Sequence, residues 1–481
     1  MTRATGLDAI VVGGGPNGLA AAIMLARAGR SVRLYEAADA AGGGLRSAEL
    51  TLPGFIHDPC SAVHPLALAS PFLRSLDLAR HGLVWVEPEA PVAHALAPGR
   101  SVVLPRRLGD LALDDALGGS DAAAWRRLFG PLAREADRLF TAILAPVVRP
   151  PRHPLLMARF ALRSALPATA LARLAFRDPP ARALLAGLAG HSMLPLGAPL
   201  SASFATVLGT LAHAVGWPLA RGGSGAIAAA LVAEARLLGV ELVAGHRVDA
   251  LADLPPARAI VLDLTPRQVL AVAGDRLPPP YRRALERYRY GPGVFKVDWA
   301  LDGPIPWRDP ATARAATVHV GGTLAEVVGG EAAVAAGRLP ERPFVLLVQP
   351  TLADPTRAPA GKHTAWAYCH VPHGSPADMT SAIEAQVERF APGFRDLILA
   401  RATRDATAME AYDANYVGGD INGGLDDWRQ LLFRPVVRWN PYTTPAPGLF
   451  LGSSSTPPGG GVHGMCGAHA ARAAERWLAR Q

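Results

Sequence analysis

Cysteine is scarce in this chain of 481 residues, which contains only Cys60, Cys369 and Cys466. The three lie far apart, and none belongs to a CxxC pair. This spacing argues against a disulfide framework, a zinc site and a redox-active dithiol. The chain also has no HExxH motif and no convincing Ser/His/Asp arrangement, so we expect no metal site.

Long apolar runs are absent too. Half of the residues are apolar, yet no uninterrupted apolar stretch reaches the roughly 18 residues that a membrane span needs. The N-terminus runs almost directly into a predicted strand, which leaves no room for a signal peptide. No internal repeat or low-complexity linker is visible in a length that corresponds to roughly three domains. These absences predict a cytoplasmic protein with interleaved domains.

Lysine is almost missing, although the chain is basic. It has 48 Lys and Arg residues against 40 Asp and Glu, a net charge of +8, and only Lys296 and Lys362 are lysines. The arginines are scattered through a chain rich in Ala, Gly and Pro, without a basic stripe interleaved with aromatic residues. The sequence therefore predicts no nucleic-acid partner.

Acidic residues are missing from one segment. Residues 138–177 contain seven arginines, many leucines and no Asp or Glu. Pro154 and Pro167 divide the segment into short predicted helices. A basic and apolar surface of this kind can lie on an anionic bilayer, so peripheral membrane contact through this segment is one expectation. The alternative is an ordinary helical lobe with solvated arginines.

The first forty or so residues carry the strongest motif. An apolar run at 8–12 precedes Gly13-Gly14-Gly15-Pro16-Asn17-Gly18, an alanine-rich helical pattern over 19–28 and a second apolar run that ends at Glu36. Strand, tight turn, helix, strand and acid in this order form the dinucleotide-binding pattern. Its three glycines would allow the turn, the approach of a pyrophosphate and close helix packing, and the helix N-terminus favours phosphate. Glu36 is placed to accept hydrogen bonds from a ribose.

A second glycine-rich loop lies near the other end. A short strand pattern at 448–452 is followed by the loop 453–467 and a helical pattern over 468–478. A chain that uses both termini for one nucleotide site resembles the superfamily of flavin monooxygenases and amine oxidases. In that superfamily a C-terminal helix directs its N-terminus at the flavin ring. The resemblance implies FAD rather than NAD, bound non-covalently, because Cys466 lies in no motif for a covalent flavin link.

The segments between these ends predict two domains. A glycine loop at 222–225 opens a helix and leads into two short strand patterns, which returns the chain to the nucleotide-binding domain. The prediction is an α/β protein in which a Rossmann-like FAD-binding domain of the amine-oxidase type is interleaved with an α+β substrate-binding domain that has a mixed sheet and a helical lobe. The FAD-binding domain is expected at 1–75, 213–290 and 441–481, and the substrate-binding domain at 76–212, mostly helical, and 291–440.

These motifs together resemble a known family. The glycine motif with Glu36, the Gly42-Gly43 pair, the 222–225 helix start and the loop 456–467 are similar to phytoene dehydrogenase-related oxidoreductases. That family includes carotenoid desaturases and proteins like pyridine nucleotide-disulfide oxidoreductase domain-containing protein 2, and is related to the flavin amine oxidases. The resemblance covers nearly the whole chain and is weak between residues 76 and 212.

The resemblance also implies the cofactor contacts. One departure is clear, because the family usually has arginine directly after the double glycine, whereas Gly44 stands there and Arg46 follows two residues later. The expected cofactor-binding residues are Gly13, Gly15, Pro16, Asn17, Gly18, Glu36, Ala37, Gly42, Gly43, Gly44, Arg46, Val248, Gly452, Ser453, Gly464 and Met465.

Two residues are candidates for catalysis. Lys296, in an apolar strand pattern, resembles the lysine that many flavin amine oxidases hold near flavin N5 through a water, and a desolvated lysine can lose its proton. The alternative is an edge-strand lysine that points to solvent. His463 lies in the C-terminal glycine loop and could move protons or brace the loop. His57 and His64 are expected either to line the substrate cavity or to have structural roles.

The resemblance implies hydride transfer at flavin N5, and the residues favour an apolar substrate. We expect C–C dehydrogenation, desaturation or a related isomerisation or saturation. Oxidation of a C–N bond is the alternative, but Gly464 and Met465 supply no aromatic wall, and a chain of charge +8 attracts cationic amines poorly. With one GxGxxG motif, electrons would leave to oxygen or a quinone. A third possibility is a non-catalytic escort of lipids or prenylated partners.

Overall fold

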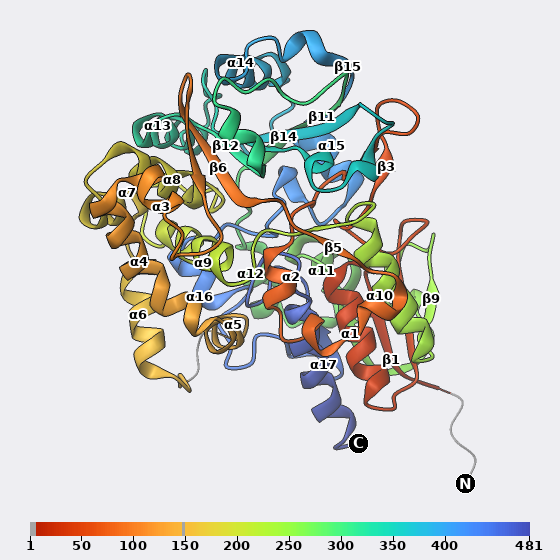
Figure 1. Cartoon of the computed structure of the whole chain (residues 1–481). Helices are drawn as coiled ribbons and strands as arrows, with labels where there is room; N and C mark the ends of the chain where they lie inside the picture. The colour runs from red at the N-terminus through yellow and green to blue at the C-terminus, as the bar shows by residue number, and fades with distance from the viewer. Residues whose placement is uncertain (1–5, 147–149) are drawn as a thin grey trace.

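The computed structural model describes residues 6–146 and 150–481, which form two large sheets with a group of helices beside them (Figure 1). In Figure 1 the nucleotide-binding sheet lies below the larger mixed sheet, and the helical lobe forms the left edge. The two sheets meet around a cavity that is described with the site.

The first sheet is parallel and has the strand order β16-β10-β1-β2-β9. Alternate residues of β1 face opposite sides, so Ala9 and Val11 pack against one group of helices and Ile10 and Val12 against another. Such burial on both faces is typical of a doubly wound sheet. Its strands are β1 Leu7–Val12, β2 Val32–Tyr35, β9 Glu241–Val243, β10 Ala257–Leu262 and β16 Leu449–Leu451. The covering helices are α1 Pro16–Arg27, α10 Gly225–Leu237 and α17 Met465–Leu478 on one face, and α11 Pro266–Ala273 and α12 Pro279–Glu286 on the other.

The second sheet is mixed and has the order β15-β11-β14-β13-β12-β6-β7. Its pairs are antiparallel except for β12 with β6. Phe295, Val297 and Trp299 of β11 face a core with α14, so the residues between them face the opposite side. The strands are β6 Ala90–Ala97, β7 Arg100–Leu104, β11 Gly293–Leu301, β12 Ala315–Val320, β13 Val345–Val348, β14 His363–Val371 and β15 Ile398–Arg404, with helices α13 Leu324–Ala335 and α14 Thr380–Phe390.

The helical lobe is shorter than the sequence predicted. Residues 76–212 are predicted to be mostly helical, but three strands, β5 (Trp85–Val86), β6 and β7, lie within 85–104. Alanine-rich strands show little alternation, and the hairpin turn at Gly99, with φ +78°, is the one local signal. The lobe consists of α3 Ala112–Leu117, α4 Gly119–Arg134, α5 Ala136–Ile143, α6 Pro154–Ser164, α7 Ala168–Ala175, α8 Pro179–Gly190 and α9 Ser201–Ala214.

Smaller elements connect these layers: β3 Ala48–Glu49, β4 Ile56–His57, α2 Pro65–Ala69, β5 Trp85–Val86, β8 Leu219–Ala220, α15 Ala406–Tyr412 and α16 Trp428–Phe433. Within the described parts of the chain, no single helix combines the length and hydropathy needed to cross a membrane. Helices α6 and α7 meet those criteria only when they are taken together, and they are bent by 103°.

The chain leaves the parallel sheet and returns to it twice. The parallel sheet takes its strands from residues 7–35, 241–262 and 449–451, and the mixed sheet from residues 90–104 and 293–404. The α/β fold with an interleaved second domain is therefore confirmed. The exact domain boundaries stay predictions.

Candidate active site

A cavity of about 610 Å³ lies between the two sheets. One end, here called the cradle, is formed by the glycine turn and the loops after β2, β10 and α15. The other end, here called the chamber, is formed by the mixed sheet, α9 and the segment 61–66. The predicted residues on the wall are Gly13, Gly15, Pro16, Asn17, Glu36, Ala37, Gly43, Gly44, Arg46, Val248 and His64.

The turn between β1 and α1 requires glycine for steric reasons. Gly13 has φ +99°, and a Cβ atom there would lie 2.7 Å from the carbonyl oxygen of Asp263. A Cβ atom on Gly18 would overlap the carbonyl oxygen of Gly13. Gly18 is therefore needed for the shape of the turn, although it lies behind the cavity wall. The turn brings the N-terminus of α1 to the cavity, where it can hold a phosphate.

Glu36 is held in place by backbone donors. Its Oε2 accepts a hydrogen bond from the Gly14 N–H at 2.7 Å, and its Oε1 accepts one from the Ala38 N–H at 2.9 Å. The carboxylate is almost buried, at 9 % exposure, and it lies on the cavity wall. It is thus pre-positioned to accept hydrogen bonds from a ribose, as the motif predicts.

Asp263 is a cradle residue that the sequence analysis missed. It directly follows β10, and its Oδ2 accepts a hydrogen bond from the Gly18 N–H at 2.7 Å. Desolvation raises the pKa of Asp263 to about 8, although that hydrogen bond lowers it. Its position at the carboxyl end of a parallel strand, where ligands bind in such sheets, was the available signal.

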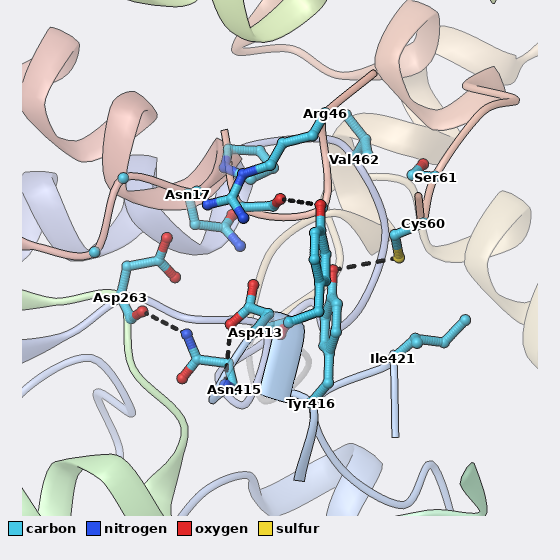
Figure 2. A pocket seen from close by; sticks show the side chains of 18 of the residues that line it. Asn17, Arg46, Cys60, Ser61, Asp263, Asp413, Asn415, Tyr416, Ile421 and Val462 are labelled. Atoms are coloured by element: carbon cyan, nitrogen blue, oxygen red, sulfur yellow. Dashed lines mark hydrogen bonds between the residues drawn. The ribbon is translucent and has the colours of Figure 1, made fainter. Parts of the chain in front are cut away.

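The end of α15 and the segment after it supply a second wall that the sequence analysis did not identify (Figure 2). The rings of Tyr412 and Tyr416 stack with centroids 6.5 Å apart. The Tyr412 hydroxyl donates to the Gly43 carbonyl at 3.2 Å, and the Cys60 thiol donates to the Tyr416 hydroxyl at 3.4 Å. Asn415 donates to the Asp263 carbonyl at 3.4 Å. These contacts connect the mixed-sheet domain to the double-glycine loop.

The same tyrosines explain the departure at Gly44. A Cβ atom on Gly44 would overlap the Tyr416 hydroxyl, so a side chain there would require this tyrosine to move. Arg46 extends into the cavity instead, as Figure 2 shows. Its guanidinium lies over the Tyr412 ring at 5.2 Å, and its Nη2 is 3.6 Å from Glu36 Oε1. The positive charge near the double glycine therefore comes from Arg46.

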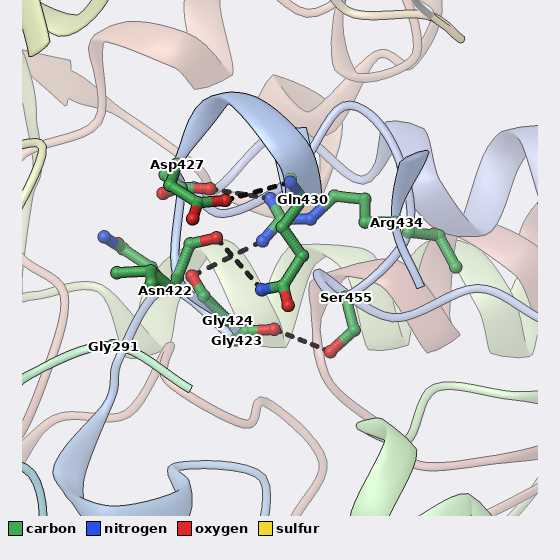
Figure 3. Close-up of polar contacts among 12 residues, drawn as sticks. Gly291, Asn422, Gly423, Gly424, Asp427, Gln430, Arg434 and Ser455 are labelled. Carbon is green, nitrogen blue, oxygen red and sulfur yellow. Dashed lines mark hydrogen bonds and ion pairs between the residues drawn. The ribbon is translucent and has the colours of Figure 1, made fainter. Parts of the chain in front are cut away.

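A buried polar cluster fixes the part of the chain between Gly423 and Arg434, which follows the segment with the two tyrosines (Figure 3). The Arg434 guanidinium is fully buried and donates to Asp426 at 2.8 Å and to the Tyr288 hydroxyl at 3.2 Å. Desolvation raises the pKa of Asp426 to about 6, against the opposing effect of Arg434. The Ser455 hydroxyl donates to the Gly423 carbonyl at 2.7 Å. The cluster thereby joins this part of the chain to the C-terminal glycine loop.

The C-terminal loop reaches the cavity through other residues than expected. Ser454, Gly461 and Val462 line it, whereas the predicted Gly452, Ser453, Gly464 and Met465 do not. This corrects their predicted position, because two of them pack against other parts of the chain. A Cβ atom added to Gly452 would lie 3.0 Å from Ala470, and one added to Gly464 would lie 2.8 Å from Phe72. Gly42, likewise, packs against Leu45 and Ala228 behind the wall.

His463 braces the loop and does not face the cavity. Its Nδ1 accepts a hydrogen bond from the Met465 N–H at 3.0 Å, at the start of α17. Desolvation lowers the pKa of His463 to about 4, so the ring is neutral at physiological pH. Of the two roles considered from the sequence, the geometry agrees with loop bracing.

Lys296 is buried and paired, and it points neither to solvent nor directly into the cavity. Strand β11 is an interior strand between β15 and β14, which rules out an edge-strand lysine. The Lys296 Nζ donates to Asp298 Oδ1 at 2.5 Å and lies 5.0 Å from the centre of the Trp366 ring. Trp366 itself lines the cavity. Desolvation lowers the pKa of Lys296 and raises that of Asp298. A catalytic role for Lys296 remains a prediction.

The two candidate cavity histidines differ. His64 lines the cavity, and desolvation lowers its pKa to about 4. His57 does not line it, so its position disagrees with the cavity role and agrees with the structural role that was the alternative. The His57 Nε2 lies 2.8 Å from the Thr51 hydroxyl, and desolvation lowers its pKa to about 3. Its strand, β4, packs against β14 behind the wall.

The chamber is apolar and aromatic. The rings of Trp366 and Tyr368 stack in parallel, with centroids 6.0 Å apart and planes 9° apart. His191, which directly follows α8, also lies on this wall, and desolvation lowers its pKa to about 3. In residues 6–146 and 150–481 no three His, Cys, Asp or Glu side chains are grouped to hold a metal ion. The chamber wall includes Val63, Leu66, His191, Leu208, Trp217, Thr317, Leu346, Val348, Trp366, Tyr368 and Ile421.

The glycine turn, the parallel sheet and the second domain define a Rossmann-like oxidoreductase fold of the flavin amine oxidase type. A family profile described as "NAD(P)-binding Rossmann-like domain" matches residues 11–72. "Pyridine nucleotide-disulfide oxidoreductase domain-containing protein 2" of Mus musculus is 26 % identical over 572 aligned positions, which cover 98 % of this chain and 94 % of the mouse protein.

Solved structures agree with this class of fold. An oxidoreductase from Methanosarcina mazei superposes with a TM-score of 0.64 at 16 % identity, covering 97 % of this chain and 99 % of that one. Cyclohexylamine Oxidase from Brevibacterium oxydans superposes with a TM-score of 0.60 at 16 % identity, covering 99 % of both chains. The similarities support the expected relationship to the mouse protein and imply FAD as the cofactor.

The cradle fits that cofactor on structural grounds. Its walls place a helix N-terminus, a fixed carboxylate and a guanidinium at successive points of one cavity. The buried Asn17 Oδ1 has no hydrogen-bond partner within the protein, although Asn17 lies on the cavity wall. An unpaired buried acceptor beside a cavity is what a bound donor would satisfy.

Proposed function

We propose that the protein is an FAD-dependent oxidoreductase that transfers a hydride between an uncharged, apolar substrate and the flavin. One observation carries this proposal, namely that none of the described residues lining the chamber is acidic or basic at physiological pH. The ionised residues of the cavity, including Glu36 and Arg46, lie at the cradle end. A charged substrate would therefore be desolvated without a partner, which is costly.

The chain's own residues have distinct tasks in this proposal. The cradle binds the cofactor through the α1 N-terminus, Glu36 and Arg46. When bound, FAD supplies a hydride acceptor or donor at its N5 position. The chamber excludes water and orients the substrate, with Trp366 and Tyr368 as a flat wall. With one dinucleotide motif in the sequence, two electrons would leave to a diffusible acceptor such as oxygen or a quinone.

Dehydrogenation, desaturation or a related isomerisation or saturation of a C–C bond fits the chamber best. In a dehydrogenation the substrate gives up a hydride, which carries two electrons and one proton to the cofactor, and a separate proton, which a base on the protein would take; the diffusible acceptor finally gains two electrons and two protons. The structure offers few proton acceptors on the chamber wall. Both His64 and His191 are neutral at physiological pH, and because desolvation lowers their pKa values to about 4 and about 3 they are weak bases that could relay that proton to water but not retain it. A cytoplasmic location also remains part of the proposal.

Amine oxidation is the second candidate because of one observation. Parallel aromatic rings such as those of Trp366 and Tyr368 can hold a cationic or neutral amine between or beside their faces. The name Cyclohexylamine Oxidase of one structural relative points in the same direction. Against it, no carboxylate lies among the described chamber residues to attract the amine.

An anaerobic substrate screen distinguishes the candidates. The purified protein is mixed with polyenes, fatty-acyl compounds, amines and amino acids, and loss of the flavin absorbance is recorded. We expect apolar compounds without nitrogen to bleach the flavin. Bleaching by amines alone would favour the second candidate. Trp366→Leu should then lower the rate of flavin bleaching more than it weakens binding of the amine. A colourless protein that binds no FAD would support the escort alternative instead.

A further inference from the structure

Helices α4 and α6 enclose a second cavity, of about 570 Å³, on the surface of the helical lobe. Five arginines dominate its wall, and no described acidic residue lines it. We call this cavity the arginine groove. Figure 1 shows α6 at the outer edge of the molecule, away from both sheets. The groove is lined by Arg126, Arg127, Arg134, Arg159 and Arg163, together with Leu128, Pro131 and Leu132.

Most of these arginines are unpaired. Arg126 forms an ion pair with Asp114 at 2.5 Å. No Asp or Glu among the described residues lies within ion-pair distance of the other four, and Arg163 donates only to the Arg159 carbonyl, at 2.9 Å. Guanidinium groups gathered without counter-charges repel each other, and a multivalent anion would relieve that repulsion. Charge alone therefore predicts an anionic partner.

Two exposed leucines beside the groove distinguish a lipid surface from a soluble anion as the partner. Leu155 is 79 % exposed and Leu162 is 73 % exposed. The two are seven residues apart on α6, with Arg159 between them on the same face of the helix. A soluble phosphate or a nucleic acid would leave these leucines in water, whereas a lipid surface would bury them. Long arginine side chains can meanwhile reach the headgroups.

We propose that the outer face of α4 and α6 docks on an anionic phospholipid bilayer. Lipid phosphates bind in the arginine groove, and Leu155 and Leu162 enter the boundary between headgroups and acyl chains. The lobe lies on the surface, because α6 and α7 are bent by 103° and each is far shorter than a membrane span. Residues 147–149, part of the segment that suggested membrane contact, lie outside the described residues, and the proposal does not depend on them.

Vesicle flotation of the full-length flavoprotein tests the proposal. The protein is mixed with vesicles of phosphatidylcholine alone, or of two parts phosphatidylcholine and one part phosphatidylglycerol, at low and at high salt. The test variant is Arg159→Gln/Arg163→Gln. The matched control is Arg282→Gln/Arg283→Gln, which removes the same charge from exposed positions on α12 in the other domain. Flavin content and circular dichroism report folding.

The expected result is binding to the anionic vesicles at low salt and little binding to neutral ones. Each arginine near an anionic surface contributes to the free energy of membrane binding. Loss of two arginines should therefore weaken partitioning of the protein onto the vesicles roughly 30-fold. The control should stay close to the wild-type protein. Leu155→Gln/Leu162→Gln should also weaken binding, without changing its salt dependence. That second variant separates insertion from charge.

Three outcomes would overturn the proposal. The first is equal flotation with neutral and anionic vesicles, and the second is equal loss in the test and control variants. The third is binding of RNA or of soluble glycerol phosphate through Arg159 and Arg163 with no flotation at all. None of these outcomes depends on the substrate, so the result stands apart from the proposed reaction.

Discussion

Replacing Lys296 by methionine tests whether this lysine holds the structure together or acts on the cofactor. Lys296 and Asp298 are each 2 % exposed, and their Nζ and Oδ1 atoms are 2.5 Å apart. Methionine keeps much of the side-chain volume but removes the positive charge. Asp298 is then left in a buried site without its partner.

The expected cost follows from that burial. Removing one member of a buried ion pair typically destabilises a protein by about 3–5 kcal/mol, because the remaining charge is uncompensated. Lys296 lowers the pKa of Asp298, whereas desolvation raises it. Without the lysine that pKa rises further, so the folded state binds an extra proton and the cost becomes larger as pH increases. The double variant Lys296→Met/Asp298→Asn leaves no unpaired charge at these two positions and should recover about half or more of the loss.

Urea unfolding of the wild-type protein, both single variants and the double variant gives the coupling free energy. A coupling of about 2–3 kcal/mol is expected for a pair in direct contact. Stopped-flow measurements of flavin reduction and reoxidation should show little change in the stable double variant. The reasoning is refuted if Lys296→Met unfolds at the same urea concentration as the wild-type protein. Normal stability with slow reoxidation would instead support the role near flavin N5.

Three further predictions follow from single residues. The pKa of Asp263 is raised from 3.8 to about 8, so between these pH values the folded state holds a proton that the unfolded state has lost. The free energy of unfolding should therefore fall by about 2 kcal/mol from pH 6 to pH 8. Asp263→Asn should remove this pH dependence in urea titrations, and an unchanged pH dependence would contradict the prediction. Gly467→Ala should destabilise the protein by about 3 kcal/mol or more and reduce bound FAD, since the new Cβ would overlap the Asn17 carbonyl oxygen. The control Gly329→Ala lies in open space on α13 and should be neutral or stabilise by up to about 1 kcal/mol. Equal effects of the two variants on thermal unfolding would count against this packing. The pKa of His191 is about 3, so the pH profile of flavin reduction between pH 5 and 8 should be the same in His191→Gln as in the wild-type protein, and loss of an ionisation in the variant would disprove it.

Much of the cradle could be predicted because its determinants are local. The GxGxxG turn needs glycine at Gly13 and Gly18 to avoid backbone overlap, and the strand, helix and acid follow within one βαβ unit. Spacing alone therefore placed Glu36 at the cavity. The two domains could be predicted for the same reason. Near both termini strands alternate with helices, which indicates the nucleotide-binding domain, whereas the run of strand patterns between them indicates a second sheet.

Residue positions in the C-terminal loop could not be predicted equally well. The sequence suggested Ser453 and Gly464, but Ser454 and Val462 reach the wall. Strands and helices have a fixed period that tells which side chains share a face, whereas a loop has none. A pair such as Lys296 and Asp298 was visible in principle, because residues two apart in a strand share a face.

The sequence by itself determined the nucleotide-binding turn and the fold class, because each follows from local backbone constraints and a conventional order of elements, while the expected cofactor came from the resemblance to a known family. Only the tertiary structure decided that Asp263, Tyr412 and Tyr416 form the cradle with residues 13–46, and that the Arg46 side chain extends into the cavity near Gly44. Those contacts join segments more than 200 residues apart along the chain. Side chains so distant meet only when two sheets pack against each other, and no spacing in the sequence records which of them will touch.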